Sequence, residues 1–435
     1  MIKHIVFFKL SKSLGHEKKQ FQLEKMKEIF SPLGKMLPYI VEYRTGTNFN
    51  DAPHAWDFTI DSIFRNKEDL QNYQDSEEHK KAVMAGSEIE KTKAVIDYQF
   101  KKQTMSELYP LTFESVLKEK VWGGTALVTR FNKKSTGSLH IGESWELSAV
   151  EDNQSVISNG FLAGNNIEEL IEVYMGDITG DAIFEKFGNE FPLLIKLIEA
   201  QEDLSIQVHP DNALAKKRHN AYGKTEMWYI LECKKDSKIF SGFKDGVTKK
   251  NYEEALISGN IEELMNVESV EPGDVFFTPA GRVHAIGAGI VLVEIQQTSD
   301  ITYRIFDWNR KGSGKEKREL HTELALDAID FNLIGENKIR MKPELNKSLN
   351  LIRCEFFNTN IISFNKAIEK EYYSIDSFVV YICIEGEFLI CWDGNSDKVI
   401  KGETVLLPAM IKEVTLKPIT EARLLEVYID TGNSI

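Results

Sequence analysis

The chain has 435 residues, of which 42% are hydrophobic and 28% charged, and its formal net charge is −14. A chain of this length predicts two to four domains, each with enough apolar residues to build a core. The negative charge argues against nucleic acid as a partner, because proteins bind it mainly through cationic groups on phosphates. A small anionic ligand stays compatible with this charge, since a few local lysine and arginine side chains can hold a phosphate.

The four cysteines, Cys233, Cys354, Cys383 and Cys391, are scattered without a CxxC pair. This spacing favours free thiols in a reducing compartment over a disulfide framework. The stretch at residues 2–9 is only briefly apolar and lacks the cleavage site of a secretion signal. No run approaches the roughly 18 apolar residues of a membrane span. We therefore predict a cytoplasmic protein that binds neither a membrane nor nucleic acid.

Residues 1–105 are predicted to form the first domain. Apolar spacing indicates a strand at 2–9, a helix at 18–30, strands at 39–44 and 57–64, a helix at 67–84 with Leu70, Tyr73 and Val83 buried, and a strand at 94–100. The order β-α-β-β-α-β is that of a ferredoxin-like domain.

This first domain resembles a known family. The sequences IKHIVFFKL at 2–10 and LQNYQ at 70–74, the latter followed by EH at 78–79, are similar to the stress-responsive dimeric α/β-barrel (Dabb) family. The resemblance implies that two copies pair their sheets into one barrel. We therefore expect a homodimer through this domain.

Three histidines of the first domain, His4, His54 and His79, could line a cavity of such a barrel and bind a ligand. Half-buried or surface positions are the more usual ones for histidine. We therefore assign this domain a dimerisation role and no chemistry.

A short polar connection at 103–110 ends in Pro110 and marks the predicted domain boundary. Beyond it, short strand patterns with turn signals dominate. Helical patterns interrupt them at 167–175, 181–187, 251–258 and 261–265. The second part is therefore predicted to be a β-rich core with a helical insertion.

An internal repeat lies within this β-rich part. GDVFFTPA at 273–280 is echoed by GETVLLPA at 402–409, and both resemble the second motif of a cupin, which is a jelly roll. The first copy continues to His284, whereas the second has Glu413 at the equivalent place. We predict an α+β chain with a ferredoxin-like α/β-barrel domain at 1–105, a catalytic cupin with a helical insertion at 106–335, and a degenerate second cupin at 336–435.

Four residues of the first predicted cupin have the chemistry of metal ligands. Gln207 and His209 are two apart on a predicted strand, so they share a face, and Glu226 and His284 also fall in or beside apolar segments. Burying one carboxylate and two imidazoles is costly without a metal or another partner. The set suits Zn²⁺ and equally the facial triad of iron enzymes. Gln207 could be a ligand or only a hydrogen-bonding neighbour.

The sequence around these ligands resembles type I mannose-6-phosphate isomerase (phosphomannose isomerase). The matching motifs, in the order of that family, are VWGG at 121–124, GESWELS at 142–148, FPLLIK at 191–196, LSIQVHPD at 204–211, GKTEMWY at 223–229 and SDITYR at 299–304. The resemblance implies an aldose–ketose isomerase that interconverts mannose 6-phosphate and fructose 6-phosphate through a cis-enediol, with Zn²⁺ as cofactor.

The same resemblance assigns roles to residues. The family's zinc ligands fall on His209, Glu226 and His284, and Gln207 matches a further ligand of the family's longer branch. The family's active-site arginine falls on Arg304, which we expect to stabilise the oxyanion that develops near the reacting carbons.

Proton transfer needs a group whose pKa lies near the working pH. The candidates are Lys224, Glu294 and Asp300, although Glu294 could equally be a structural partner of Arg304, and Asp300 a turn residue. The resemblance and their positions imply that Ser205, Lys196 and Arg310 hold the substrate phosphate, although Arg310 could equally be a solvated loop residue.

Two other functions fit part of this pattern. A metal-dependent cupin oxygenase would use the same ligands, and a catalytically silent sugar-phosphate sensor would keep the same fold. The motifs beyond the ligands favour the isomerase, and the presence of the three ligands together with Arg304 favours an active enzyme.

Overall fold

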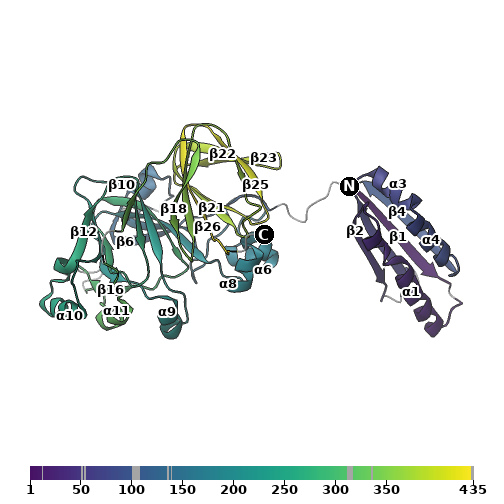
Figure 1. Cartoon of the computed structure of the whole chain (residues 1–435), viewed down its shortest axis with the longest axis horizontal. Coiled ribbons are helices and arrows are strands. Elements are labelled where there is room, and N and C mark those ends of the chain that lie inside the picture. The colour runs from purple at the N-terminus through teal and green to yellow at the C-terminus, as the bar shows by residue number, and fades with distance from the viewer. Residues whose placement is uncertain are drawn as a thin grey trace. The chain divides into compact units, whose positions relative to one another are not determined.

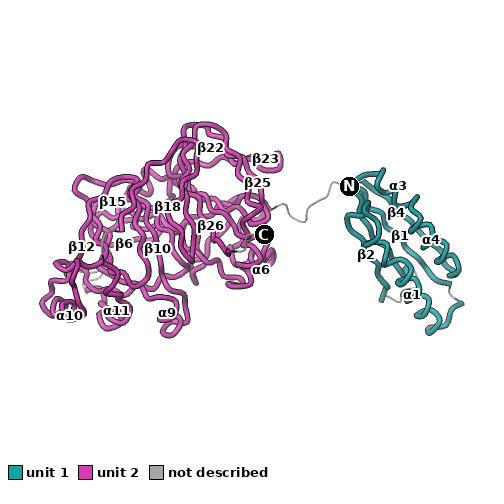
Figure 2. The backbone as a smooth tube through the Cα atoms, in the orientation of Figure 1, with its two compact units in different colours: residues 1–107 teal, residues 108–435 magenta. Residues whose placement is uncertain are grey.

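The computed structural model describes the chain except residues 12, 50, 51, 53, 54, 100–107, 135, 136, 139, 311–316, 335, 336 and 433–435. The chain divides into two compact units, Met1–Glu107 and Leu108–Ile435 (Figure 2). No helix in the described ranges is long and apolar enough to cross a membrane. His54 and the last residue of the strand predicted at 94–100 lie outside the described residues.

The first unit has the predicted ferredoxin-like fold, with an antiparallel sheet in the order β2-β3-β1-β4 (Figure 1). Its elements are β1 (Ile2–Leu10), α1 (His16–Phe30), α2 (Leu33–Met36), β2 (Ile40–Thr47), β3 (Phe58–Phe64), α3 (Lys67–Asp75), α4 (Glu77–Gly86) and β4 (Lys91–Gln99). Burial alternates strictly along β1. One face of the sheet therefore packs into the unit's core, and the other is only partly covered.

The helix predicted at 67–84 is two helices, because the chain is extended at Ser76. The Ser76 side chain accepts a hydrogen bond from the first turn of α4 and so caps that helix. Apolar spacing alone did not reveal this break. Leu70 and Tyr73 are buried as predicted, whereas Val83 is 47% exposed, so the prediction for Val83 was wrong.

The second unit contains two β-sandwiches, which confirms the predicted double jelly roll (Figure 1). The seven-stranded sheet of the first sandwich runs β17 (Lys338–Arg340), β13 (Asp274–Thr278), β10 (Glu226–Cys233), β15 (Ile290–Gln297), β8 (Leu193–Ala200), β7 (Ile141–Leu147) and β6 (Val116–Gly124). Its five-stranded sheet runs β12 (Met265–Ser269), β11 (Lys238–Phe243), β14 (His284–Ile286), β9 (Ile206–Val208) and β16 (Tyr303–Phe306).

The second sandwich has a six-stranded and a four-stranded sheet. The first runs β18 (Lys347–Arg353), β19 (Asn358–Phe364), β26 (Ala422–Tyr428), β21 (Val379–Glu385), β24 (Thr404–Leu407) and β5 (Leu111–Thr112). The other runs β20 (Ile368–Glu371), β25 (Glu413–Pro418), β22 (Glu387–Trp392) and β23 (Asn395–Ile400).

The two sandwiches exchange edge strands. β5, at the start of the unit, pairs with β24 of the second sandwich, and β17, late in the chain, pairs with β13 of the first. A shared apolar cluster joins them and includes the rings of Phe191 and Phe378, whose centroids are 4.5 Å apart. Both sandwiches belong to one compact unit. The structure therefore does not test the predicted domain boundary at 335/336, which stays a prediction.

Helices occur where the sequence predicted a helical insertion. They are α6 (Ile167–Tyr174), α8 (Asp181–Phe187), α10 (Lys249–Ser258) and the 3-10 helix η1 (Ile261–Leu264). In the second unit the pattern missed α5 (Ala126–Arg130), α7 (Gly176–Thr179), α9 (Asn212–His219) and α11 (Thr322–Ala328). These four are short. α9 also lacks a clear apolar stripe and begins where the Asp211 side chain accepts a hydrogen bond from Leu214 N.

Candidate metal centre and active site

Three strands of the first sandwich position the predicted metal ligands. His209 directly follows β9, Glu226 begins β10 and His284 begins β14. β9 and β14 are antiparallel neighbours in which His284 pairs with Gln207, and β10 belongs to the facing sheet. Closure of the sandwich therefore brings residues that are distant in sequence together in its interior.

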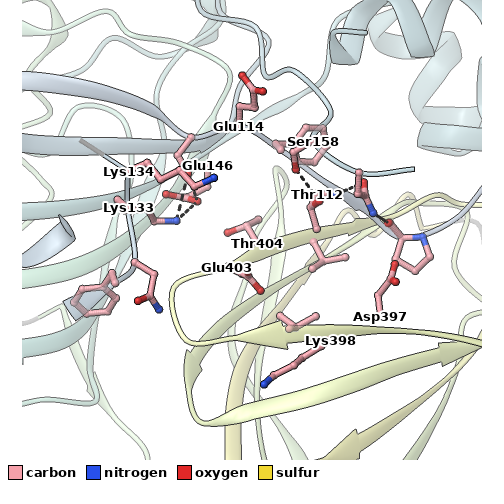
Figure 3. Close-up of a pocket in the computed structure, with 18 residues that line it drawn as sticks. Thr112, Glu114, Lys133, Lys134, Glu146, Ser158, Asp397, Lys398, Glu403 and Thr404 are labelled. Atoms are coloured by element: carbon pink, nitrogen blue, oxygen red, sulfur yellow. Dashed lines mark hydrogen bonds and ion pairs between the residues drawn. The ribbon is translucent and has the colours of Figure 1, made fainter. Parts of the chain in front are cut away.

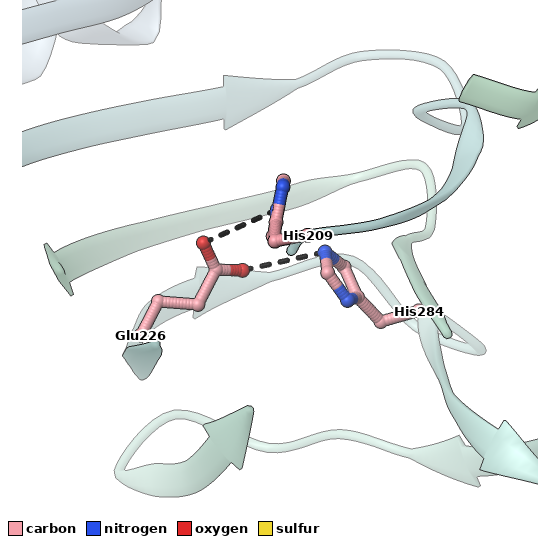
Figure 4. A group of neighbouring side chains, drawn as sticks. All are labelled: His209, Glu226 and His284. Carbon is pink, nitrogen blue, oxygen red and sulfur yellow. Dashed lines mark ion pairs between the residues drawn. The ribbon is translucent and has the colours of Figure 1, made fainter. Parts of the chain in front are cut away.

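The Glu226 carboxylate faces both imidazoles, with one oxygen towards each (Figure 4). His209 Nε2 is 3.5 Å from Oε2, and His284 Nε2 is 3.3 Å from Oε1. The ligand atoms of the three residues all lie within 4.8 Å of one another. None of the three side chains is more than 1% exposed, so the cluster is shielded from bulk water.

Backbone carbonyls fix the orientation of both imidazoles. Nδ1 of His209 lies 2.8 Å from the carbonyl oxygen of Ile301, and Nδ1 of His284 lies 2.9 Å from that of Arg282. A carbonyl can only accept, so each Nδ1 carries the proton and donates it, and each Nε2 presents a lone pair, with Lys224 Nζ 3.3 Å from that of His209. A hydrogen bond of this kind is the usual way to orient a metal-binding histidine.

Burial sets the charge state of the cluster. It lowers the pKa of His284 to about 4 and that of His209 well below its usual value. Both imidazoles are therefore neutral at pH 7, as metal ligands must be. Burial also raises the pKa of Glu226, an increase that the Lys224 ammonium, 3.1 Å away, opposes.

The residues fit a divalent metal ion. Neither oxygen of Glu226 accepts a hydrogen bond of regular geometry from the described residues, although both are buried. Such a carboxylate is costly to bury unless a cation satisfies it. Two imidazole nitrogens and a carboxylate are a donor set that Zn²⁺, Fe²⁺ and related ions accept.

Gln207 lies beside this cluster. Its Nε2 is 3.3 Å from His284 Nε2, and its Oε1 is 3.5 Å from the Ser205 hydroxyl. The amide NH₂ thus faces the imidazole lone pair, while the oxygen that could bind a metal faces the hydroxyl. A role of Gln207 as a ligand stays a prediction.

A cavity of about 300 Å³ adjoins the cluster. The residues that the sequence predicted and that line it are Ser205, Gln207, Lys196, Lys224, Glu294, Asp300 and Arg304. A cavity of this volume can hold a small organic ligand. The structure therefore gathers both the proton-transfer candidates and most of the expected phosphate contacts next to the metal ligands.

Among the residues predicted to hold the phosphate, Arg310 is the one that does not line this cavity. Its guanidinium is paired with Asp307 at 2.8 Å and Glu202 at 3.4 Å. Arg318, which the sequence reasoning missed, does line the cavity, and its Nε donates to Asp307 at 2.7 Å. Burial and the neighbouring Arg318 both lower the pKa of Arg304. Two guanidinium groups therefore stand near each other at the cavity wall.

Sequence reasoning also missed Lys120 and Glu143, which line the cavity and form an ion pair at 3.1 Å. A signal for both was available. Lys120 directly precedes the VWGG motif, and Glu143 lies within GESWELS. Arg318 had no such signal, because it follows a stretch rich in lysine and arginine from which no single residue stands out.

A buried ion pair occupies the back of the cavity. The Lys196 ammonium donates to Glu294 Oε1 at 3.0 Å and to Gln296 Oε1 at 2.9 Å, and the Trp228 indole donates to Glu294 Oε2 at 3.0 Å. Burial alone would raise the pKa of Glu294, but Lys196 and Lys224 lower it below its usual value. Glu294 is therefore an ionised carboxylate with both oxygens engaged.

A larger cavity of about 760 Å³ lies between the two sandwiches, lined from both of them (Figure 3). There the buried Lys133 ammonium lies 2.6 Å from Glu146 and donates to the Gly402 carbonyl at 2.6 Å. None of the predicted site residues lines it. Size alone therefore does not identify the functional site, and the smaller cavity is the one that adjoins the candidate metal ligands.

The second sandwich preserves the framework of the site without its ligands. Glu226 pairs with Thr278 just before Pro279, and in the second copy Val379 pairs with Leu407 just before Pro408. Likewise His284 begins β14, whereas the exposed Glu413 begins β25. The fold and the site together are those of a double cupin in which the first jelly roll holds a candidate His/Glu metal site.

Comparisons with known proteins agree with this class. The profile described as phosphomannose isomerase type I, catalytic domain, matches residues 111–236, and that of the mannose-6-phosphate isomerase cupin domain matches 347–429. The stress responsive A/B barrel domain matches 2–100. Mannose-6-phosphate isomerase ManA of Bacillus subtilis is 36% identical over 318 residues, which are 72% of this chain and 97% of ManA. The chain therefore belongs to the type I mannose-6-phosphate isomerase family.

Further relatives support this assignment. A mannose-6-phosphate isomerase of Streptococcus mutans is 37% identical over 224 residues, which are 51% of this chain and 67% of that protein. A crystal structure of the mannose 6-phosphate isomerase from Bacillus subtilis has a TM-score of 0.65 and 31% identity, and covers 74% of this chain and 100% of that one. A putative mannosephosphate isomerase from Archaeoglobus fulgidus, at 23% identity and a TM-score of 0.61, covers 75% and 99% and shows the fold alone.

Proposed function

We propose that this enzyme interconverts mannose 6-phosphate and fructose 6-phosphate at the cavity beside His209, Glu226 and His284. The proposal rests on one observation. The buried side chains of His209, Glu226 and His284 adjoin a cavity of about 300 Å³ that is lined by several lysine and arginine residues. An aldose–ketose isomerisation needs positive charge near the reacting oxygens and a group that moves a proton between neighbouring carbons. The names of the family's curated members support the same substrate pair.

We propose Zn²⁺ as the metal, with His209, Glu226 and His284 as its ligands. When bound, the ion supplies a Lewis acid that stabilises the oxyanion of a cis-enediol intermediate. The chain itself supplies the neutral imidazoles, oriented by the Ile301 and Arg282 carbonyls, and the carboxylate that balances the charge.

The arrangement narrows the choice of proton-transfer group. Both oxygens of Glu294 already accept hydrogen bonds, one from Lys196 and one from Trp228. Glu294 is therefore better suited to hold Lys196 in place than to transfer a proton. Lys224 and Asp300 line the cavity and remain the two candidates for proton transfer.

The substrate phosphate is proposed to lie near Arg304 and Arg318. Arg318 is paired with Asp307, and the Arg304 guanidinium beside it adds a second positive charge, so a dianion at this wall would accept charge-assisted hydrogen bonds and offset the repulsion between the two groups. Ser205 offers a hydroxyl in the same cavity lining, whereas Lys196 is paired with Glu294, and Arg310 does not line the cavity.

One preparation tests the function and the metal together. Elemental analysis should find zinc, mannose 6-phosphate should be isomerised, and a strong chelator should abolish the activity. His284→Ala should lose most of the metal and at least roughly a hundredfold in kcat/KM, whereas His140→Ala, at an exposed position, should match the parent protein. Full turnover by metal-free protein would contradict the metal assignment, and bound iron with oxygen consumption would favour the oxygenase.

We also propose that the first unit dimerises through the open face of its sheet. On this face Ile5 of β1 pairs with Ile96 of β4, which is 50% exposed, and the neighbouring Tyr98 is 46% exposed. The ion pair between Lys3 and Asp61, at 2.7 Å, lies on the same face. An exposed apolar sheet face flanked by charge is typical of a surface that another protein covers.

A further inference from the structure

The larger cavity, between the two sandwiches, takes no part in the proposed isomerisation. Its volume is about 760 Å³. Ligand pockets usually measure roughly 300–1,000 Å³, and gaps left by imperfect packing are much smaller. This volume therefore matches a site for an organic molecule.

Strand β7 separates this cavity from the one beside the metal ligands. Glu143 and Trp145 of the strand line the smaller cavity, and Glu146 lines the larger one. Successive side chains of a strand point to opposite faces of the sheet. The two cavities are therefore distinct, and a ligand in one leaves the other free.

A buried ion pair forms part of the wall of the larger cavity. Lys133 is 7% exposed and Glu146 is 4% exposed. The Lys133 ammonium lies 2.6 Å from Glu146 Oε2 and donates to the Gly402 carbonyl at 2.6 Å. The other oxygen, Oε1 of Glu146, accepts from the Ser144 hydroxyl at 2.5 Å. Both charges of this pair are therefore satisfied within the protein.

Three carboxylates at the same cavity have no cationic partner among the described residues. They belong to the exposed Glu114 and the half-buried Asp397 and Glu403. Burial raises the pKa of Asp397, and no neighbouring cation lowers it. Glu403 Oε2 accepts only a backbone hydrogen bond, from Ile400 N at 2.9 Å. A ligand that brings hydrogen-bond donors would therefore meet free acceptors here.

The Thr404 hydroxyl is a further polar group at this cavity (Figure 3). Side chains alternate along β24, so Thr404 shares a face with Leu406, which belongs to the apolar cluster between the sandwiches, whereas Val405 faces the second sandwich's own core. Thr404 is only 5% exposed, and its Oγ1 has no hydrogen bond among the described residues. Burying a hydroxyl without a partner is unfavourable. A ligand atom at this wall would satisfy it.

The lysines of the cavity leave its charge negative. Lys133 is paired with Glu146, and Lys398 is paired with Glu387 at 2.6 Å. Lys134 is exposed and is the one cavity lysine without a carboxylate partner among the described residues. Three unpaired carboxylates thus face one unpaired ammonium group. This balance disfavours an anion, and an ammonium group would be attracted where a neutral polyol would leave the carboxylate charge unpaired.

Apolar side chains lie between these polar groups. Pro110, Phe113 and Val399 line the cavity, and Val399 is 1% exposed. Methylene groups pack favourably against such surfaces because their contact removes apolar area from water. An amine whose ammonium groups are joined by methylene spacers would match both features of the wall.

We propose that the cavity between the two sandwiches binds a small organic polycation of this kind, with ammonium groups that pair with Asp397 and Glu403 and one that donates to Thr404 Oγ1. The site differs from the sugar-phosphate cavity in place and in charge. The proposal does not depend on the isomerase activity.

Three probes test the proposal on the full-length protein. Spermidine is a polycation with methylene spacers, triethylene glycol is an uncharged chain of equal length, and tricarballylate is an anion. Isothermal titration calorimetry at pH 7.5, in about 0.15 M salt to screen the general negative charge of the protein, compares them. The Kd for spermidine should be at least roughly tenfold lower than that for triethylene glycol, which is the usual effect of one charge-assisted hydrogen bond. Tricarballylate should bind more weakly than spermidine.

Charge-removing substitutions of equal size locate the binding. Glu403→Gln and Asp397→Asn should each raise the Kd for spermidine roughly three- to tenfold, and the double variant should raise it further. Glutamine at 403 can still accept from the Ile400 amide, and Asp397 makes no hydrogen bond to a described residue, so the thermal unfolding of both variants should match that of the parent protein. The control is Glu185→Gln, which removes an exposed carboxylate on α8, away from this cavity lining, and should leave the Kd unchanged.

Several results would overturn the proposal. They are an absence of spermidine binding, equal or tighter binding of triethylene glycol or tricarballylate, and an unchanged Kd for spermidine in both Glu403→Gln and Asp397→Asn. An equal loss of affinity in Glu185→Gln would also overturn it, because it would assign the binding to the general negative charge of the surface.

Discussion

At the scale of single residues, the metal centre depends on three side chains that are each unfavourable to bury alone. Glu226 has no regular hydrogen bond among the described residues, and the two imidazoles are held neutral by burial. Such groups are stable when buried together only if a cation binds them or if neighbouring groups offset the free energy that their burial costs. The sequence predicted all three as ligands, because they match the ligand positions of a known family, and the structure brings them together.

The pKa of His284 predicts how stability depends on pH in metal-free protein. It is about 4 in the folded chain against 6.5 for an ordinary histidine, so the unfolded chain binds more protons between these values. The stabilising contribution of neutral His284 is complete above pH 6.5 and is lost as the pH falls towards 4. Urea unfolding in chelator should show a loss of about 2 kcal/mol from this group between pH 7 and pH 5.

The control for this titration is His284→Gln, which cannot gain a proton. Its free energy of unfolding should change less between pH 7 and pH 5 than that of the parent protein. An equal change in both proteins would show that other groups dominate the acid response.

The buried pair of Lys196 and Glu294 makes a second prediction at this scale. Lys196→Met should destabilise the protein by roughly 3–5 kcal/mol, because it leaves an unpaired carboxylate in the interior. The double variant Lys196→Met/Glu294→Gln should recover part of the loss, since glutamine can still accept from the Trp228 indole. Urea unfolding at pH 7.5 measures both. A single variant as stable as the parent would mean that water reaches Glu294.

At the scale of secondary-structure elements, the sequence predicted the strands of the first unit and most of the longer helices, but it described the second unit only as a series of short strands. The four helical patterns in the insertion correspond to α6, α8, α10 and η1, because apolar spacing reports the buried face of a helix directly. α9 was missed because its residues show no such face. The break at Ser76 was missed because the apolar pattern runs through it.

One contact between elements ties the helical insertion to the second sandwich. The Asp376 carboxylate accepts hydrogen bonds from the backbone amides of Asp181 at 3.0 Å and Ala182 at 2.9 Å, and so caps α8 from a distant part of the chain. Asp376→Ala should lower the free energy of unfolding by roughly 0.5–2 kcal/mol. Asp376→Asn keeps an acceptor and should cost less.

The comparison variant for this cap is Glu185→Ala, which removes an exposed carboxylate from the same helix. Thermal or urea unfolding should show little change for Glu185→Ala. If both variants behaved alike, the cap would contribute nothing and the contact would be incidental.

At the scale of the whole molecule, the chain joins two units with separate cores. Relatives that are matched over 97% to 100% of their own length cover only 72% to 74% of this chain, so the isomerase part is complete in proteins of that length. Deleting residues 1–107 should therefore leave mannose 6-phosphate isomerisation within a few-fold of the full chain.

The same deletion tests the role of the first unit. Light scattering should find a dimer for the full chain and a monomer for the shortened one, because the exposed apolar face around Ile96 is removed. A milder variant, Ile96→Lys, should weaken the dimer and leave isomerisation unchanged. An unchanged dimer after the deletion would place the interface in the second unit.

The sequence by itself determined the order of elements in the first unit and the double jelly roll of the second, and it predicted the candidate metal ligands, because apolar periodicity and residue chemistry are local properties. Only the tertiary structure decided what surrounds those ligands. In the structure Lys196 is paired with Glu294, and Arg310 is paired with Asp307. Arg318 and Lys120 line the cavity. The amide nitrogen of Gln207 faces His284. These outcomes depend on which strands face each other across a closed sandwich, and strand pairing is set by contacts between residues that lie far apart in the chain.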